Sequence, residues 1–96
     1  MTLKQLIEEK RDEILRLAVK HGARNVRLFG SAARGEDRPD SDVDFLVEAG
    51  PTTSSWFPAG LILDLEETLG RRVEIVTDRG LNPYLRDQVL REAIPL

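Results

Sequence analysis

The segment from Asp42 to Glu48 constrains this chain most, because apolar residues occupy every second position and all its acids, together with Leu46, occupy the positions between. Such alternation is typical of a strand with one buried face and one open face. The apolar side of the strand consists of Val43, Phe45 and Val47. Asp42 and Asp44 lie on the other side, roughly 6.6 Å apart along the strand. The segment therefore predicts a strand that packs against a core while it holds two carboxylates on its opposite face.

The two carboxylates indicate a candidate metal site. Neighbouring carboxylates repel each other unless a cation lies between them. Mg²⁺ prefers carboxylate oxygens and keeps several waters that substrate phosphates can replace. The alternative interpretation of Asp42 and Asp44 is an ordinary solvated strand face, and the acidic pair alone does not decide between the two.

A glycine and a serine, Gly30 and Ser31, directly follow an apolar segment that predicts a strand at residues 25–29. Glycine allows the backbone to approach a phosphate closely, and free amides at the start of a short helix bind anions. Ser31 adds a hydroxyl donor, and Arg34 adds a positive charge. An ordinary turn between a strand and a loop is the alternative. The segment is not a P-loop, because no Gly-Lys-Ser/Thr follows at the required spacing.

Hydrophobic periodicity predicts the remaining elements. We expect helices over residues 3–21 and 57–69, a further strand over 72–76, and a last helix that opens at Asn82-Pro83 and stops before Pro95. Residues 30–41 read as a loop with room for one helical turn after Ser31. Trp56 and Phe57 are expected to pack in the core. The result is an α+β fold, a small three-stranded sheet packed with helices, whose strand directions the spacing leaves open.

Size and charge limit what this chain can bind. Its 96 residues are predicted to form a single domain, 1–96, and the absence of cysteine excludes disulfides and thiolate metal sites. A net charge of −3, from 14 basic and 17 acidic residues, argues against direct nucleic-acid binding. No apolar run approaches the ~18 residues of a membrane span. We therefore expect a cytoplasmic protein without membrane contact, and homo-oligomerisation is left open.

Taken together, the motifs resemble a known family. The stretch Gly30-Ser31-Ala32-Ala33-Arg34-Gly35, followed by Ser41-Asp42-Val43-Asp44, resembles the signature of the minimal nucleotidyltransferases of the DNA polymerase β superfamily. The resemblance implies that family's fold, a mixed sheet in the order α-β-(α)-β-α-β-α. It also implies an ATP substrate, two Mg²⁺ ions held by catalytic acids at Asp42 and Asp44, and nucleotide contacts from the residues Gly30, Ser31, Arg34 and Ser41.

Active members of this superfamily carry a third acid on a later strand, and Glu74 is the candidate here. By this resemblance Glu74 would complete the catalytic and metal-binding set, although the family more often has aspartate at this position. Glutamate is one methylene longer, so its grip on a metal would be looser. The alternative is an exposed glutamate paired with Arg72, which contributes little to stability.

The resemblance also implies a partner. Small members of this family are often encoded beside a HEPN-type ribonuclease toxin, and the chain is then the antitoxin. It would transfer AMP from ATP to a tyrosine hydroxyl of that toxin. Two alternatives remain open: a non-catalytic antitoxin that neutralises its partner by binding, and nucleotidyl transfer to a small molecule. The short chain disfavours the second alternative, since little of it is left for a substrate-binding appendage.

Overall fold

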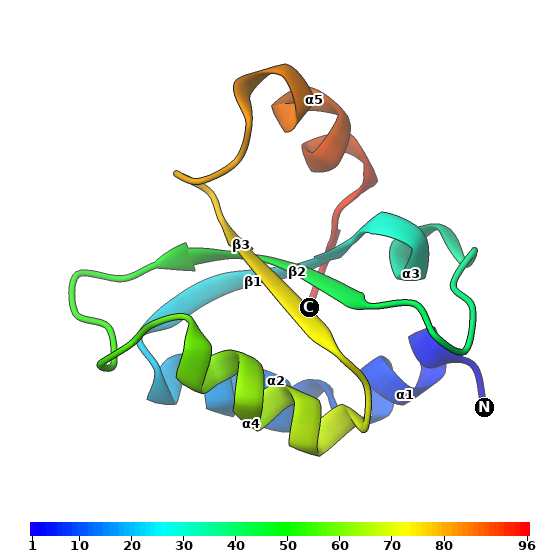
Figure 1. Cartoon of the computed structure of the whole chain (residues 1–96), viewed down its shortest axis with the longest axis horizontal. Coiled ribbons are helices and arrows are strands. Elements are labelled where there is room, and N and C mark those ends of the chain that lie inside the picture. The colour runs from blue at the N-terminus through cyan, green and yellow to red at the C-terminus, as the bar shows by residue number, and fades with distance from the viewer.

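The computed structural model describes residues 1–96 and is built around one four-stranded mixed sheet (Figure 1). The strands lie in the order β3-β2-β1-β4. Strand β1 runs antiparallel to β2 and to β4, whereas β2 and β3 are parallel. The bounds are β1 Ala23–Phe29, β2 Val43–Ala49, β3 Val73–Thr77 and β4 Ile94–Pro95. The strands that carry Asp44 and Glu74 are therefore neighbours.

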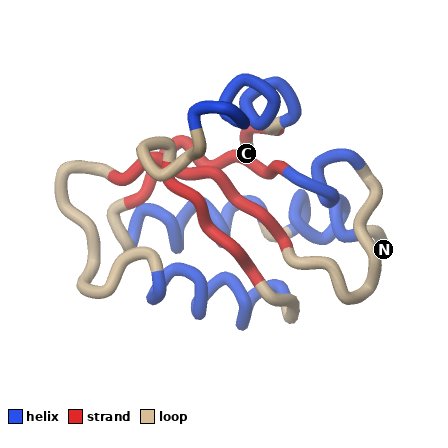
Figure 2. The backbone as a smooth tube through the Cα atoms, turned by 45° about the horizontal axis from the view of Figure 1, so that its top comes forward, coloured by secondary structure: helices blue, strands red, loops and turns tan.

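The helices divide unequally between the two faces of the sheet. Figures 1 and 2 show α1, α2 and α4 on one face and α5 on the opposite face. The short α3 follows β1 directly and packs at the end of the sheet. The bounds are α1 Leu3–Glu9, α2 Arg11–Lys20, α3 Gly30–Arg34, α4 Ala59–Leu69 and α5 Pro83–Glu92. This arrangement confirms the α+β class. None of these helices has the length and apolar character needed to cross a membrane.

The main core lies between the sheet and helices α1, α2 and α4. The side chains of β2 that were predicted to face inward, Val43, Phe45 and Val47, are at most 1% exposed. They join buried residues of the helices in one cluster, for which Ile14 and Leu65 are central examples. Removing such a side chain by substitution with alanine typically costs about 2–5 kcal/mol. This core fixes which face of β2 points inward and therefore turns Asp44 outward.

The expected three strands are one too few, because β4 was not predicted. It pairs Ile94 with Leu28 and Pro95 with Arg27 at the edge of β1. Two residues are too short to show an alternating pattern, and Pro95 was interpreted only as a helix stop. A proline is compatible with an edge strand, where its missing N–H faces away from the ladder.

The helix expected over residues 3–21 is interrupted at Lys10. The predicted capping box is present: the Gln5 amide donates to Thr2 Oγ1 at 3.1 Å, and the Thr2 amide donates to Gln5 Oε1 at 2.8 Å. At Lys10 the backbone leaves helical geometry, with φ −93° and ψ 10°, and α2 begins at the next residue. The break lets α1 and α2 each bury a pair of side chains of its own against the sheet.

The other predicted helices are present, with their ends shifted by one or two residues. The helical turn expected after Ser31 is α3, and it begins one residue earlier, at Gly30. Pro58 precedes α4 as its N-cap, and Asn82 caps α5 with a hydrogen bond from the Tyr84 amide. Trp56 is a correction: it was expected in the core, but it is 88% exposed. Only Phe57 packs against the core, and it does so partly.

Candidate functional site

The acidic residues gather where β2 and β3 begin. Asp42 immediately precedes β2, and Asp44 is its second residue. The parallel register places Asp44 directly opposite Glu74 of β3. Because Phe45 points into the core, Asp44 and Glu74 share the opposite face of the sheet. Glu74 is exposed and Asp44 is half-buried, so the pair can be reached from outside.

The environment of Asp44 is unfavourable for a negative charge. The pKa of Asp44 is raised from 3.8 to about 6, first by burial and then by the charge of Glu74, hydrogen bonding with Glu74 and the charge of Asp42. The positive charge of Arg34 acts in the opposite direction. A carboxylate whose charge is destabilised in this way binds a proton or a metal ion readily. A shifted pKa of this kind is typical of functional sites.

Asp42 has a weak counter-ion. Its Oδ1 lies 3.1 Å from Nε of Arg72. The same oxygen is shielded from water and accepts no hydrogen bond, since the ion pair is close in distance but poorly aligned. The Arg72 side chain is 80% exposed. Exposed ion pairs of this kind contribute about 0–1 kcal/mol, so Asp42 remains available to a stronger cation.

Gly30 forms the wall of the site beside Asp44. Its φ of +73° lies in the left-handed region that favours glycine. A Cβ at this position would collide with Oδ2 of Asp44. Ser31 follows in the first turn of α3. The close packing of Gly30 against Asp44 brings the two sequence motifs into one place.

The remaining predicted nucleotide contacts are occupied by protein groups. Arg34 donates to Glu36 at 3.0 Å and to Glu92 of α5 at 3.0 Å, and both acids hold the pKa of Arg34 above its usual value. The Ser41 hydroxyl accepts a hydrogen bond from the Arg38 amide at 2.8 Å. A role for Arg34 or Ser41 in nucleotide binding therefore stays a prediction. It requires each side chain to exchange its present protein partners for the nucleotide.

The carboxylates of Asp42, Asp44 and Glu74 are suitable ligands for a divalent cation, although they are not arranged in a complete coordination site. No three acidic or histidine side chains converge closely enough to hold one ion. The chemistry is nevertheless suitable, because Asp42 offers a shielded oxygen without a hydrogen bond and Asp44 is crowded by two other carboxylates. Oxygen ligands in excess of nearby positive charge are what Mg²⁺ prefers.

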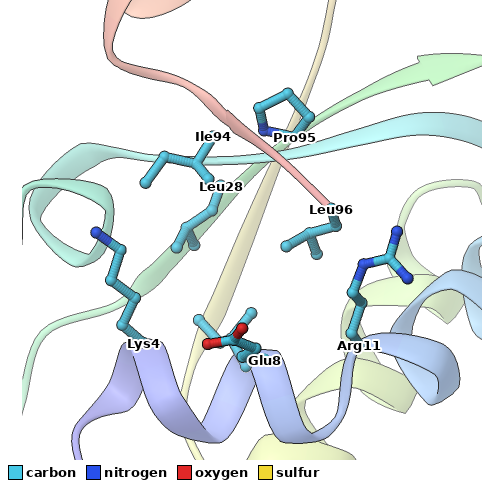
Figure 3. A pocket seen from close by; sticks show the side chains of 8 residues that line it. Lys4, Glu8, Arg11, Leu28, Ile94, Pro95 and Leu96 are labelled. Atoms are coloured by element: carbon cyan, nitrogen blue, oxygen red, sulfur yellow. The ribbon is translucent and has the colours of Figure 1, made fainter.

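The most enclosed hollow of the surface lies elsewhere. It has a volume of about 240 Å³ and lies between α1 and the β1–β4 edge, on the core side of the sheet (Figure 3). Its lining combines apolar side chains such as Leu28 and Ile94 with the charged residues Lys4, Glu8 and Arg11. None of the predicted site residues lines it, so this hollow is separate from the acidic site.

Two arginines near the site were not predicted correctly from the sequence: Arg72 was assigned another partner, and Arg71 was overlooked. Arg72 was considered only as a partner for Glu74, whereas it pairs with Asp42. Arg71 was not singled out, yet its Nη2 donates to the carbonyl oxygens of Arg38 and Ser41. Their position directly after the α4 stop at Gly70 was the one available signal. It could not show that they reach across to the loop before β2.

Residues 7–96 match the family described as Nucleotidyltransferase domain. The chain belongs to this nucleotidyltransferase family. A solved structure provisionally identified as a minimal nucleotidyltransferase is 52% identical, with a TM-score of 0.87 over 100% of this chain and 97% of the other. The family, fold and enzyme class expected from the motifs are confirmed.

Two further relatives have more specific descriptions. A protein of Methanocaldococcus jannaschii, provisionally assigned as a protein adenylyltransferase, is 39% identical over 92% of this chain and 95% of its own length. A solved complex contains a tri-AMPylated Shewanella oneidensis HEPN toxin and its MNT antitoxin. Its matching chain is 26% identical, with a TM-score of 0.67 over 96% of this nucleotidyltransferase and 70% of the other chain.

Proposed function

We propose that this nucleotidyltransferase transfers AMP from ATP to a tyrosine hydroxyl of a HEPN-type toxin and thereby acts as its antitoxin. The observation that carries the proposal is the pairing of Asp44 with Glu74 on one sheet face, directly against Gly30. The S. oneidensis complex supports the partner, because the toxin in it is AMPylated and bound to an antitoxin similar to this chain.

Asp42 and Asp44 are the residues that would hold Mg²⁺, with Glu74 as the third acid. When bound, the metal neutralises negative charge on the triphosphate and on the oxygens that attack and leave. The protein contributes carboxylates whose mutual repulsion is relieved by a proton or by a cation. Arg72 partly neutralises Asp42, and Arg34 partly offsets the charge around Asp44.

The other residues position the reactants. The amides at Gly30 and Ser31 and the Ser31 hydroxyl are suited to donate to the phosphates of ATP. The acceptor oxygen attacks the α-phosphorus, the bond to the β-phosphate oxygen breaks, and pyrophosphate leaves. We assign to Glu74, which is exposed beside Asp44, the role of accepting the proton of the attacking hydroxyl. Positioning and charge neutralisation supply most of the rate enhancement in this kind of chemistry.

The decisive experiment combines the purified chain with the product of the adjacent gene, α-labelled ATP and Mg²⁺. We expect label on the partner, and loss of label with Asp44→Asn or with a chelator. Asp40→Asn is the matched control, because Asp40 is an exposed acid of the preceding loop. A stable complex without label would favour neutralisation by binding alone. Label on small molecules but never on protein would contradict the proposed acceptor.

A further inference from the structure

Arg71 joins two loops that meet at the acidic site. It lies in the connection between α4 and β3, one residue before Arg72. Its Nη2 donates to the carbonyl oxygen of Arg38 and to the carbonyl oxygen of Ser41, each at 2.7 Å. A guanidinium is always charged, and hydrogen bonds from a charged donor are shorter and stronger than neutral ones. Nη2 of Arg71 is thus hydrogen-bonded to both ends of the tight turn at residues 38–41.

This turn, residues 38–41, delivers Asp42 to the site. The Ser41 amide donates to the Arg38 carbonyl at 2.9 Å, and the Arg38 amide donates to the Ser41 hydroxyl at 2.8 Å. These bonds are internal to the turn and do not attach it to the rest of the protein. For residues 37–41 the only hydrogen bonds to other parts of the chain come from Arg71.

The clamped atoms are directly connected to the acid. The Ser41 carbonyl belongs to the peptide bond that joins Ser41 to Asp42, so fixing this oxygen fixes the start of the Asp42 backbone. One residue further on, the Val43 amide donates to the Arg72 carbonyl at 2.9 Å and begins the pairing of β2 with β3. The segment Arg71–Arg72 therefore sets both the loop that carries Asp42 and the strand that carries Glu74.

We propose that Arg71 is a positioning residue that clamps the turn at residues 38–41 and thereby holds Asp42 in place for nucleotidyl transfer. The proposal rests on the function proposed above. Arg71 does not contact the carboxylate itself, because its bonds go to backbone oxygens. Its effect passes through the loop, where a displacement of ~1 Å at a reacting group can cost about 10²-fold in rate.

The test compares Arg71→Met, which keeps the length of the side chain but removes its donors, with Arg71→Lys, which keeps a charged donor. Arg16→Met is the matched control, since the Arg16 side chain is exposed on α2 and makes no hydrogen bond or ion pair. Three quantities are measured: hydrogen exchange of the Ser41 amide, Mg²⁺ affinity by calorimetry, and kcat and KM for AMP transfer. Exchange of the Ile14 amide in α2 reports whether the fold is intact.

We expect Arg71→Met to accelerate exchange at Ser41 by about tenfold or more, to weaken Mg²⁺ binding, and to lower kcat by about 10²-fold. Exchange at Ile14 should stay unchanged, and Arg71→Lys should recover most of each loss. Unchanged Ser41 exchange, or faster exchange with unchanged Mg²⁺ affinity and kcat, would overturn the positioning role. Absence of Mg²⁺ binding and transfer in the unmodified protein would instead contradict the proposed function, and with it any role for Arg71 in that reaction.

Discussion

Asp44 of β2 and Glu74 of β3 lie directly opposite each other in parallel register, and this pairing raises the pKa of Asp44 in addition to the effect of burial. The ionised Asp44 is therefore less stable in the folded protein than in the unfolded chain. The linkage has a definite sign: the cost is absent below the unfolded pKa of 3.8, grows as the pH rises, and is complete above about 6. The site thus lowers the stability of the metal-free fold at neutral pH.

We predict that Asp44→Asn abolishes AMP transfer but stabilises the metal-free protein near neutral pH. A shift of this size would correspond to almost 3 kcal/mol, but solvent screening at a half-exposed group reduces the expected gain to about 1 kcal/mol. Urea unfolding in the presence of a chelator measures it. The gain over the unmodified protein should be larger at about pH 7.5 than at about pH 4.5, because Asp44 is largely protonated in acid. Equal gains at both pH values would exclude the repulsion as the cause.

The second prediction concerns the third acid. Glu74→Gln should lower kcat by about 10²-fold, because the amide cannot accept the proton of the attacking hydroxyl. Glu74 is exposed, so the free energy of unfolding should change by less than about 0.5 kcal/mol. Glu74→Asp should keep a larger share of the activity, since it keeps the carboxylate. Labelled-ATP transfer measures both variants, and full activity of Glu74→Gln would remove this residue from the site.

Gly30 offers a test that separates backbone strain from damage to the site. Gly30→Ala should lose activity, because its Cβ would displace the Asp44 carboxylate. The matched control is Gly70→Ala, where φ is +67° but no other atom lies within 4 Å of the added Cβ. Both changes should cost about 1–2 kcal/mol of stability through the left-handed backbone. Only Gly30→Ala should also abolish transfer, and loss of activity in both would attribute the effect to destabilisation.

Several parts of the site could be predicted from local pattern alone. Strand periodicity places Asp44 on the face opposite Phe45, whereas the nearness of Gly30 followed only from the resemblance to the nucleotidyltransferase signature. The register that pairs Asp44 with Glu74 was not predicted, because strand directions were left open: the twelve-residue connection after the first strand fitted both a crossover and a return. Arg71 and Arg72 were also beyond reach, since their partners lie about 30 residues away in the sequence. Contacts of that kind depend on tertiary packing rather than on local propensity.

A buried histidine, His21, lies at the C-terminal end of α2 and joins this helix to two other segments. His21 Nδ1 lies 2.7 Å from the Ser54 hydroxyl and Nε2 lies 2.7 Å from Oδ2 of Asp64. Hydrogen bonding with His21, and then with Lys20, lowers the pKa of Asp64. A depressed carboxyl pKa contributes stability that is present above the unfolded pKa of 3.8 and is lost as the pH falls through the folded value.

We therefore predict that Asp64→Asn destabilises the protein at neutral pH and that this difference shrinks in acid. Urea unfolding at about pH 7 and about pH 3 measures it, with Glu67→Gln on the exposed side of α4 as the control. AMP transfer should be unaffected wherever the variant is folded, because the cluster lies away from the acidic site. A pH-independent destabilisation would indicate lost packing rather than lost charge.

The last prediction follows from the contact between Arg72 and Asp42. A metal ion that binds Asp42 must compete with the Arg72 guanidinium for Oδ1, an oxygen with no hydrogen bond of its own. Arg72→Gln should therefore raise the affinity of the nucleotide-free protein for Mg²⁺. The increase should be modest, about two- to fivefold, because exposed ion pairs contribute less than about 1 kcal/mol.

Calorimetric titration with Mg²⁺ measures this change, and Asp42→Asn serves as the reference in which the competition is lost together with the ligand. The effect should diminish at high ionic strength, where the Arg72–Asp42 attraction is screened in the unmodified protein. Weaker Mg²⁺ binding by Arg72→Gln would show that the guanidinium supports the metal-bound arrangement of Asp42. Arg72 would then hold the carboxylate in place for the metal rather than compete with the metal for it.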